Sequence, residues 1–298
     1  MEKMQKPILL DGSMGQELAN RGAKTQYGLW AVAALYEHPT MVQTVHEDYI
    51  RAGAEVITTN TYATTRTRLR HVGQEDRLAE LVRIAGTLAI QAREKTQAKH
   101  VKIAASLPPL EGSYISNFKL DFDSMVAEYR ELMDLLEPSV NIYLAETLST
   151  SQEARAVLTA AQDKNKPVWI SWTLQDHGSS TLRGGESIQQ AIDSIRDFSV
   201  DAILINCCTP DSIEAALPTL QASNMPFGAY ANGFVEIPTD WAYLDSVKQL
   251  ESRTDLSPKH YAQQAKKWLH AGASIIGGCC EVAPQHIAKL HAIIDDIV

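Results

Sequence analysis

Short runs of apolar and β-branched residues recur along this chain, and they alternate with longer stretches that are apolar on one side only. Continuous apolar runs are typical of strands that are buried on both faces, as in a parallel sheet. We therefore expect eight strands, at residues 8–11, 55–60, 101–106, 140–146, 167–173, 202–207, 226–231 and 273–278.

Between these runs, apolar residues repeat every three or four positions, which predicts amphipathic helices. The stretch 41–53, for example, carries Met41, Val45 and Tyr49 at a spacing of four and ends at a glycine. The complete set of predicted helices is 41–53, 77–94, 122–136, 151–162, 187–198, 212–221, 258–272 and 284–298.

A helix after each of eight strands predicts an α/β fold, a (β/α)₈ TIM barrel that forms a single domain over residues 1–298. An open, doubly wound sheet is the alternative, and the count of eight strands favours the closed barrel. Two connections are long, at residues 12–40 and 232–257, and each is either a lid or a packing insertion.

Charge and composition limit the classes of partner that the protein is expected to bind. Lys and Arg number 27 against 36 Asp and Glu, and the resulting net charge of −9 argues against nucleic acid. The longest uncharged stretch, residues 215–235, is interrupted by prolines and asparagines, so no membrane span is expected. The start of the chain lacks the apolar region of a secretion signal, which predicts a cytoplasmic protein with reduced thiols. A homo-oligomer is compatible with these features.

All four cysteines occur as two adjacent pairs, in ILINCCTP (203–210) and IIGGCCEVAP (275–284). Neighbouring cysteines fit disulfide geometry poorly, and clustered cytosolic cysteines are more typical of metal or catalytic sites. The pairs follow the sixth and eighth predicted strands, whose carboxyl ends share one rim of a barrel. The two glycines allow the backbone to leave strand alternation, which predicts a Zn²⁺ site with an open fourth position and the ligands Cys207, Cys279 and Cys280.

Other interpretations of these residues stay open. Cys208 is explained best as a small buried side chain, and buried thiols are also the alternative to a zinc site for the other three cysteines. The Gly-Gly pair ahead of a helix is also a pattern that cradles phosphate, although Glu281 would repel that ligand. A thiol redox pair is disfavoured because the chain has no C-x-x-C motif.

Polar residues end six of the eight predicted strands, at the rim where a barrel enzyme carries its site. Together with their neighbours they resemble the homocysteine S-methyltransferase family, in order from residue 11 to about residue 290. The resemblance rests on DGSMGQEL (11–18), HEDYIRAGAEVITTNTY (46–62), AET (145–147), INC (205–207), YANG (230–233) and GGCC (277–280).

The resemblance implies a barrel enzyme with zinc on Cys207 and on the doublet Cys279-Cys280. It also implies that Asp11, Gly12 and Glu146 hold the amino acid, with Asp11 and Glu146 as the carboxylates of the catalytic centre. The expected reaction moves a methyl group from a small onium donor, S-methylmethionine ahead of betaine, to the thiol of homocysteine and gives methionine. Since 298 residues leave no room for folate or cobalamin modules, the donor is expected to be a freely diffusing small molecule. Zn²⁺ is the expected cofactor, and homocysteine and the methyl donor are the expected small-molecule partners.

Further residues at the strand ends are expected to support substrate binding. Tyr62 follows the second strand and is expected to face the cationic donor, with core packing as the alternative. For Trp172, contact with the donor and packing in the core are both open. Thr147, Asn206 and Asn232 are expected to bind substrate or to support it through hydrogen bonds. Ala283 stands where the family often has threonine, which predicts a weak start of the last helix.

Two rival functions remain at this point. One is a phosphate-binding barrel lyase or isomerase, for which no Schiff-base lysine is evident at a strand end. The other is a regulatory protein that binds zinc and a thiol without turnover.

Overall fold

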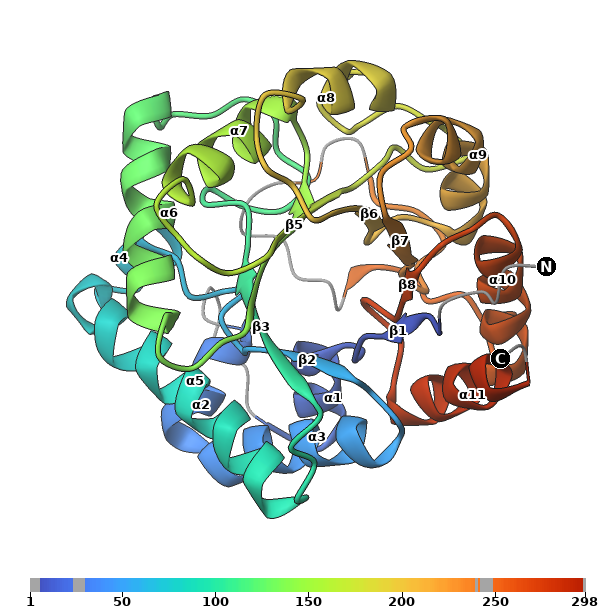
Figure 1. Ribbon diagram of the computed structural model, residues 1–298. Helices are drawn as coiled ribbons and strands as arrows, with labels where there is room; N and C mark the ends of the chain where they lie inside the picture. The colour runs from blue at the N-terminus through green and yellow to red at the C-terminus, as the bar shows by residue number, and fades with distance from the viewer. Residues whose placement is uncertain (1–5, 24–29, 239–240, 242–248, 297–298) are drawn as a thin grey trace.

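The computed structural model describes residues 6–23, 30–238, 241 and 249–296, and over these residues eight parallel strands alternate with helices (Figure 1). The strands are ordered β1-β8-β7-β6-β5-β4-β3-β2. The ring closes between β1 and β2, because the Glu55 N–H donates to the Leu9 carbonyl (2.8 Å) and the Asp11 N–H to the Val56 carbonyl (3.0 Å). The predicted (β/α)₈ barrel is confirmed, and the open sheet is wrong.

The strands and helices have the following bounds. The strands are β1 (Ile8–Leu9), β2 (Val56–Thr58), β3 (Lys102–Leu107), β4 (Ile142–Leu148), β5 (Val168–Trp172), β6 (Ala202–Asn206), β7 (Phe227–Tyr230) and β8 (Ile275–Ile276). The helices are α1 (Met14–Asn20), η1 (Trp30–Val32), α2 (Ala34–Glu37), α3 (Pro39–Arg51), α4 (Arg66–His71), η2 (Glu75–Arg77), α5 (Leu78–Lys95), α6 (Phe122–Leu136), α7 (Ser151–Ala160), α8 (Ile188–Ser194), α9 (Pro210–Ala222), α10 (Pro258–His270) and α11 (Pro284–Asp295).

Alternation along the strands sorts the buried side chains into two cores. One core lies between the strands and the surrounding helices. It includes Trp172, which is fully buried and whose indole N–H donates to the Thr150 carbonyl (3.3 Å). Of the two interpretations of Trp172, core packing is therefore confirmed and contact with a donor is wrong. The second core fills the barrel and consists of Leu10, Val56, Ala104, Ile142, Leu144, Trp169, Ala202, Leu204, Tyr230 and Ile275.

Element bounds follow the sequence prediction unevenly. Helix α6 occupies the predicted range 122–136, whereas β8 is limited to Ile275–Ile276 instead of 273–278. Helices α1, α2 and α4 were not predicted, and the first two lie with η1 in the described part of the connection 12–40. The end of the helix predicted at 284–298, and parts of the connections 12–40 and 232–257, fall outside the described residues.

Ala283 is the N-cap of helix α11 and offers no side-chain hydrogen bond, as expected from the sequence. His286 compensates from inside the helix, because its Nδ1 accepts from the Ala283 N–H (3.1 Å). Its Nε2 lies 3.2 Å from the Leu256 carbonyl. Burial lowers the pKa of His286, which fits a neutral ring that accepts at Nδ1 and donates at Nε2.

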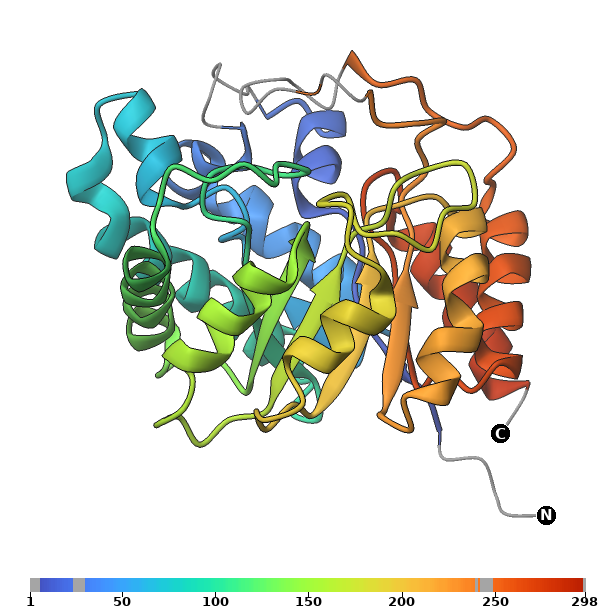
Figure 2. The ribbon, with the colours of Figure 1, turned by 90° about the horizontal axis from the view of Figure 1, so that it is seen from above.

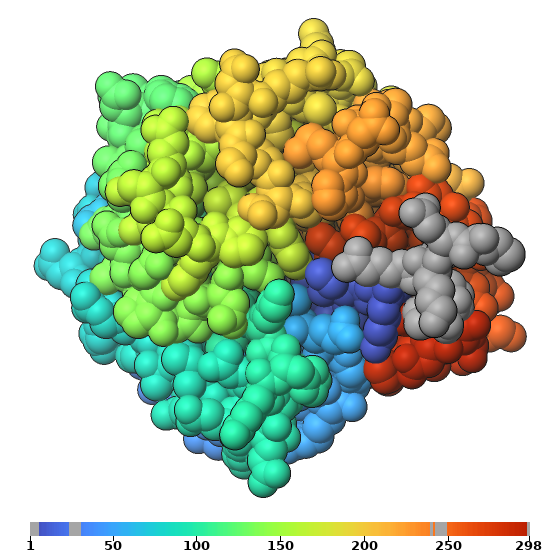
Figure 3. Space-filling view, in the orientation of Figure 1, coloured from blue at the N-terminus to red at the C-terminus, as the bar shows by residue number. Residues whose placement is uncertain are grey.

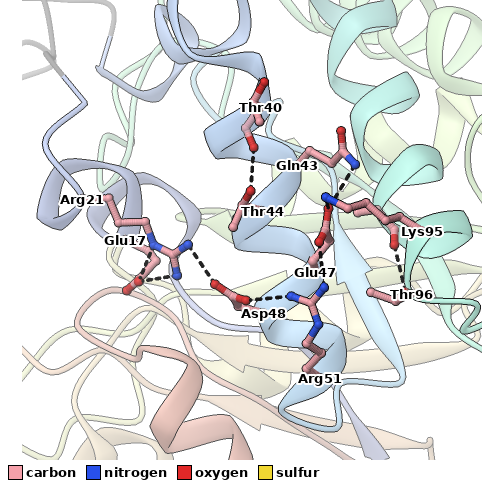
Figure 4. Close-up of polar contacts among 11 residues, drawn as sticks. Glu17, Arg21, Thr40, Gln43, Thr44, Glu47, Asp48, Arg51, Lys95 and Thr96 are labelled. Carbon is pink, nitrogen blue, oxygen red and sulfur yellow. Dashed lines mark hydrogen bonds and ion pairs between the residues drawn. The ribbon is translucent and has the colours of Figure 1, made fainter.

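An ion-pair network fastens three helices together on one side of the barrel (Figure 4). The Glu47 carboxylate on α3, with only 3% of its side chain exposed, is paired with Lys95 of α5 (2.9 Å) and with Arg51 (2.8 Å). Asp48 of α3 joins Arg51 (3.0 Å) to Arg21, the C-cap of α1 (2.8 Å). The buried Glu47 carboxylate therefore has two cationic partners, which offset the cost of removing its charge from water.

The two ends of the barrel differ. The loops that follow β3, β5 and β7 gather at the carboxyl end of the strands, at the top of Figure 2. The opposite end, where the strands begin, faces the viewer in Figure 3. Lys6 precedes β1 and forms an ion pair with Asp295 (4.0 Å), so residues near both ends of the described chain are neighbours. Within the described residues, no helix is both long enough and apolar enough to cross a membrane.

Candidate metal and substrate site

Three of the four cysteines meet at the carboxyl end of the barrel. The Sγ atoms of Cys207, Cys279 and Cys280 all lie within 4.8 Å of one another, and the distance from Cys207 to Cys280 is 3.8 Å. Cys208 points away into the core between strands and helices, where it is fully buried. The structure thus brings together the trio that the sequence singled out and separates Cys208 from it.

The backbone turns sharply at both cysteine pairs. Cys207 follows the last residue of β6 and adopts a left-handed conformation (φ 52°), as does Glu281 after the doublet (φ 67°). Such conformations are costly for residues other than glycine and cluster at functional sites. Gly277 and Gly278 are needed because neighbouring side chains pack closely against them. A Cβ would lie 2.5 Å from the Leu10 Cβ at Gly277 and 1.9 Å from a Val282 methyl at Gly278.

Hydrogen bonds between the three cysteine side chains shift their pKa values in opposite directions. Hydrogen bonds from Cys279 and Cys280 hold the pKa of Cys207 well below its usual range. The same bonds, seen from the donors, raise the pKa of Cys279 and of Cys280 well above theirs. The cluster is therefore prepared to carry negative charge at Cys207, which suits a cation as ligand.

Two carboxylates lie in the same mouth, on β4 and directly after β1. Glu146 accepts hydrogen bonds from Ser106 and from the Tyr230 hydroxyl (3.3 Å). Burial raises its pKa to about 7 in spite of these bonds, and the charge of Cys207 adds to the increase. Burial likewise raises the pKa of Asp11 well above its usual range, although Thr58 donates to Asp11 from its N–H (2.7 Å).

Asn206 ties the carboxylate strand to the cysteines. Its Oδ1 accepts from the Thr147 N–H (2.8 Å) and from the Ser171 hydroxyl (2.7 Å). Its Nδ2 donates to the Thr147 hydroxyl (2.8 Å) and lies 3.9 Å from the Cys279 sulfur. Thr147 is left-handed (φ 62°), at an irregularity in the β4–β5 register. Asn206 and Thr147 therefore hold the site in shape, as local bulges beside active sites often do.

The remaining predicted residues take different places. Gly12 is packed so closely that a Cβ would lie 2.2 Å from the Val282 carbonyl. Asn232 is fully buried, and its Nδ2 has no partner among the described residues. Tyr62 is half-buried at the mouth, and its hydroxyl bonds the Ser113 hydroxyl (2.7 Å). Contact of these three residues with a substrate stays a prediction.

Tyr114 touches the cysteine cluster directly, although it was not predicted from the sequence. Its hydroxyl lies 3.1 Å from the Cys207 sulfur, and its ring meets Trp241 edge to face at 6.0 Å. Tyr114 belongs to the irregular loop after β3 and is itself left-handed (φ 65°). No periodic pattern marks such a residue, so only tertiary structure reveals its position.

The connection 232–257 covers the cysteines with apolar side chains. Phe234 and Ile237 pack with Cys207 and Cys280, and Leu250 adds to the cluster. An antiparallel bridge between Phe234 and Ser252 holds the described parts of this segment together. The described part of the connection is therefore a cover over the cluster rather than a packing insertion elsewhere.

A phosphate cradle at the Gly-Gly pair conflicts with the backbone hydrogen bonds. A phosphate cradle needs backbone N–H groups that are free to donate to the phosphate. Five backbone N–H groups at and after the Gly-Gly pair already donate to acceptors within the protein. These are the N–H groups of Gly278, Cys279, Glu281, Val282 and Ala283.

A buried ion pair stands beside the cysteine pair of β6. Arg183 donates to Asp176 (2.9 Å), with 10% and 4% of their side chains exposed. The Arg183 guanidinium lies over the Tyr114 ring, 4.7 Å from its centre. Burial raises the pKa of Cys208 to about 12, and both charges of the pair act on that thiol as well.

Comparison with known proteins agrees with this geometry. The family described as homocysteine S-methyltransferase matches residues 8–294. This chain belongs to that family. The resemblance seen in the sequence is confirmed, together with the predicted enzyme class.

Individual relatives match over nearly their whole length. The homocysteine S-methyltransferase of Escherichia coli is 29% identical, over 96% of this chain and 94% of its own. Homocysteine S-methyltransferase YbgG of Bacillus subtilis is 27% identical, over 96% and 93%. The crystal structure of the homocysteine methyltransferase MmuM from E. coli, in its metallated form, superposes with a TM-score of 0.81 at 27% identity, covering 97% of this chain and 96% of that one.

Proposed function

We propose that this chain is a zinc-dependent methyltransferase that moves a methyl group from a small onium donor to the thiol of homocysteine. The observation that carries the proposal is the cluster of three cysteine sulfurs beside two buried carboxylates, Asp11 and Glu146. A thiol needs a metal or base to become a nucleophile, and an amino acid needs an anionic partner for its ammonium group. The mouth of the barrel offers both.

The three sulfurs fit zinc. Tetrahedral zinc with Zn–S bonds of about 2.3 Å places its sulfurs about 3.8 Å apart, and Cys207 and Cys280 are separated by 3.8 Å. Three protein ligands leave one position for substrate. Zinc held by Cys207, Cys279 and Cys280 would supply a Lewis acid that lowers the pKa of the homocysteine thiol.

The chain's own residues bind and orient the two substrates. Glu146 and Asp11 would share the homocysteine ammonium, whose positive charge favours the ionised form of both carboxylates. Asn206 keeps Thr147, and with it the end of β4, in the required left-handed turn. The apolar cover of Phe234 and Ile237 would exclude water from the sulfur, which strengthens a thiolate as nucleophile.

The chemistry of the transfer favours an onium donor. The substrate sulfur forms a bond to the methyl carbon as the bond between that carbon and the donor heteroatom breaks. The electron pair goes to the donor, which leaves uncharged, and the thiol proton is released. We propose S-methylmethionine ahead of betaine, because a sulfonium departs more readily than a trimethylammonium.

The test is methionine formation from homocysteine with S-methylmethionine, betaine, a methylated folate and methylcobalamin, each supplied alone. Zinc-loaded protein should work with an onium donor, and metal-free protein should not. Activity only with the folate or the corrinoid would refute the donor class. Activity with betaine alone would refute only the ranking, and zinc-loaded protein that binds homocysteine without any turnover would favour the regulatory alternative.

Variants of the cysteines test the ligand set. Cys207→Ser and Cys279→Ser should lose zinc on dialysis against a mild chelator, since each removes one of three ligands. Cys208→Ser is the matched control, because that thiol lies in the core and not in the cluster. Full zinc retention by Cys207→Ser would show that the ligand set is wrong.

A cytoplasmic location remains a prediction, consistent with four free cysteines. A homo-oligomer and a single domain over residues 1–298 also remain predictions.

A further inference from the structure

The ion pair of Asp176 and Arg183 has hydrogen-bonding atoms that no described residue contacts. Arg183 gives one hydrogen bond to Asp176 through Nη2, and Asp176 accepts a second from the Ile237 N–H (2.8 Å). The Arg183 Nε and the Asp176 Oδ1 are buried and have no partner among the described residues. A pair with only a structural role is better satisfied by two parallel bonds, as carboxylate and guanidinium often form.

The position of the pair relates it to the reacting centre. The Arg183 guanidinium stacks on Tyr114, whose hydroxyl touches the Cys207 sulfur (3.1 Å). Asp176 holds the backbone of Ile237, which packs on Cys207 and Cys280. Asp176 and Arg183 both lie on the loop after β5. The protein carboxylates proposed to bind homocysteine, Glu146 and Asp11, lie on β4 and after β1. Two groups of charged residues therefore lie near the cysteine cluster on different elements. One is Asp11 with Glu146, and the other is Asp176 with Arg183.

We propose that Arg183 and Asp176 bind the amino-acid end of the methyl donor, with Arg183 on its carboxylate and Asp176 on its ammonium. This inference rests on the proposed function and narrows its donor to onium α-amino acids. A zwitterion supplies an acceptor for the unpartnered Nε and a donor for the unpartnered Oδ1 at once. Betaine offers the carboxylate only, because its nitrogen carries no hydrogen.

The experiment compares S-methylmethionine with its carboxamide, which keeps the sulfonium and the ammonium but loses the carboxylate charge. Wild-type protein should prefer S-methylmethionine in kcat/KM by about ten- to hundredfold, the usual effect of one charge-assisted hydrogen bond. In Arg183→Gln that preference should fall to within about threefold. N-Acetyl-S-methylmethionine, which lacks the ammonium charge, should lose its disadvantage in Asp176→Asn in the same way.

The ratio of two donors in one variant does not depend on the fraction of protein that is folded. Arg130→Gln is the matched control, because Arg130 forms an exposed ion pair with Asp163 (2.8 Å) and should keep the wild-type ratio. An unchanged ratio in Arg183→Gln would overturn the inference and make the pair an anchor of the cover. Activity with betaine but with no sulfonium donor would also overturn the inference and leave the proposed function standing. Wild-type protein inactive with every onium donor would instead overturn the proposed function.

Discussion

Asp11 and Glu146 are two buried carboxylates whose hydrogen-bond partners are hydroxyl and amide groups. Among the described residues, no lysine, arginine or histidine forms a hydrogen bond or ion pair with either carboxylate. Burying anionic groups without a cation is unfavourable, so each pKa rises. A substrate ammonium would therefore provide the positive charge that these two buried carboxylates lack in the free protein.

Replacing Glu146 by glutamine should weaken homocysteine binding about ten- to hundredfold and leave zinc content unchanged. The lost charge-assisted bond is worth roughly 1.5–3 kcal/mol. Calorimetric titration of zinc-loaded protein measures the affinity. Glu153→Gln is the control, because Glu153 is also a buried carboxylate but caps α7 (Ser149 N–H at 2.8 Å). Equal affinities in wild type and Glu146→Gln would remove Glu146 from the substrate site.

Tyr114→Phe should weaken zinc binding by about tenfold and keep the fold. The hydroxyl that contacts the Cys207 sulfur is lost, and partners of metal ligands typically contribute ten- to hundredfold in metal affinity. Competition with a chromophoric chelator measures this affinity. Tyr129→Phe also loses a buried hydroxyl, which donates to the Pro108 carbonyl (3.0 Å), and should bind zinc as wild type does. Identical zinc affinities for both variants would contradict the assignment.

Among the secondary-structure elements, the strands and long helices position the site and the connections complete it. Helix α6 was predictable to the residue because Asp121 caps it and its apolar positions repeat over four turns. The cysteine trio and the carboxylates were predictable because they lie at or close to the carboxyl ends of strands. Tyr114, Asp176 and Arg183 were not, since they lie in irregular loops whose course depends on contacts distant in sequence. Helix α4 was missed because only Leu69 of its six residues is buried.

Helix α11 offers a prediction of increased stability. Ala283→Thr should raise the free energy of unfolding by about 1 kcal/mol, because a hydroxyl at the N-cap can accept from an amide in the first turn. Urea denaturation measures the change. Ala283→Val adds a side chain of similar shape without the hydroxyl and should give no such gain. A gain of the same size with valine would attribute the effect to packing instead of capping.

For the molecule as a whole, stability should depend on pH through a core histidine. His46 of α3 is fully buried, and neither ring nitrogen has a partner among the described residues. Burial lowers its pKa from 6.5 to about 4. Between these values the unfolded chain binds a proton that the folded chain does not, so stability is complete above pH 6.5 and falls as the pH decreases.

The expected loss between pH 6.5 and 4 is about 3 kcal/mol for this one residue. His46→Leu should flatten the dependence of unfolding free energy on pH in that interval, whatever its effect at neutral pH. His100→Gln, which changes an exposed histidine, should retain the wild-type slope. Urea titrations at several pH values provide the comparison, and parallel curves for His46→Leu and wild type would rule out the histidine as the source.

The ion pair between Lys6 and Asp295 has a practical consequence for handling the protein. These residues near the two ends of the described chain are neighbours at the amino end of the strands, and the cysteine cluster lies at the other end. An affinity tag or a fused carrier at either end should therefore project from the face remote from the cysteines. Protein immobilised through such a tag would present its mouth to dissolved substrate, and a short peptide joining the two ends would permit new ends to be opened in another loop at the same face.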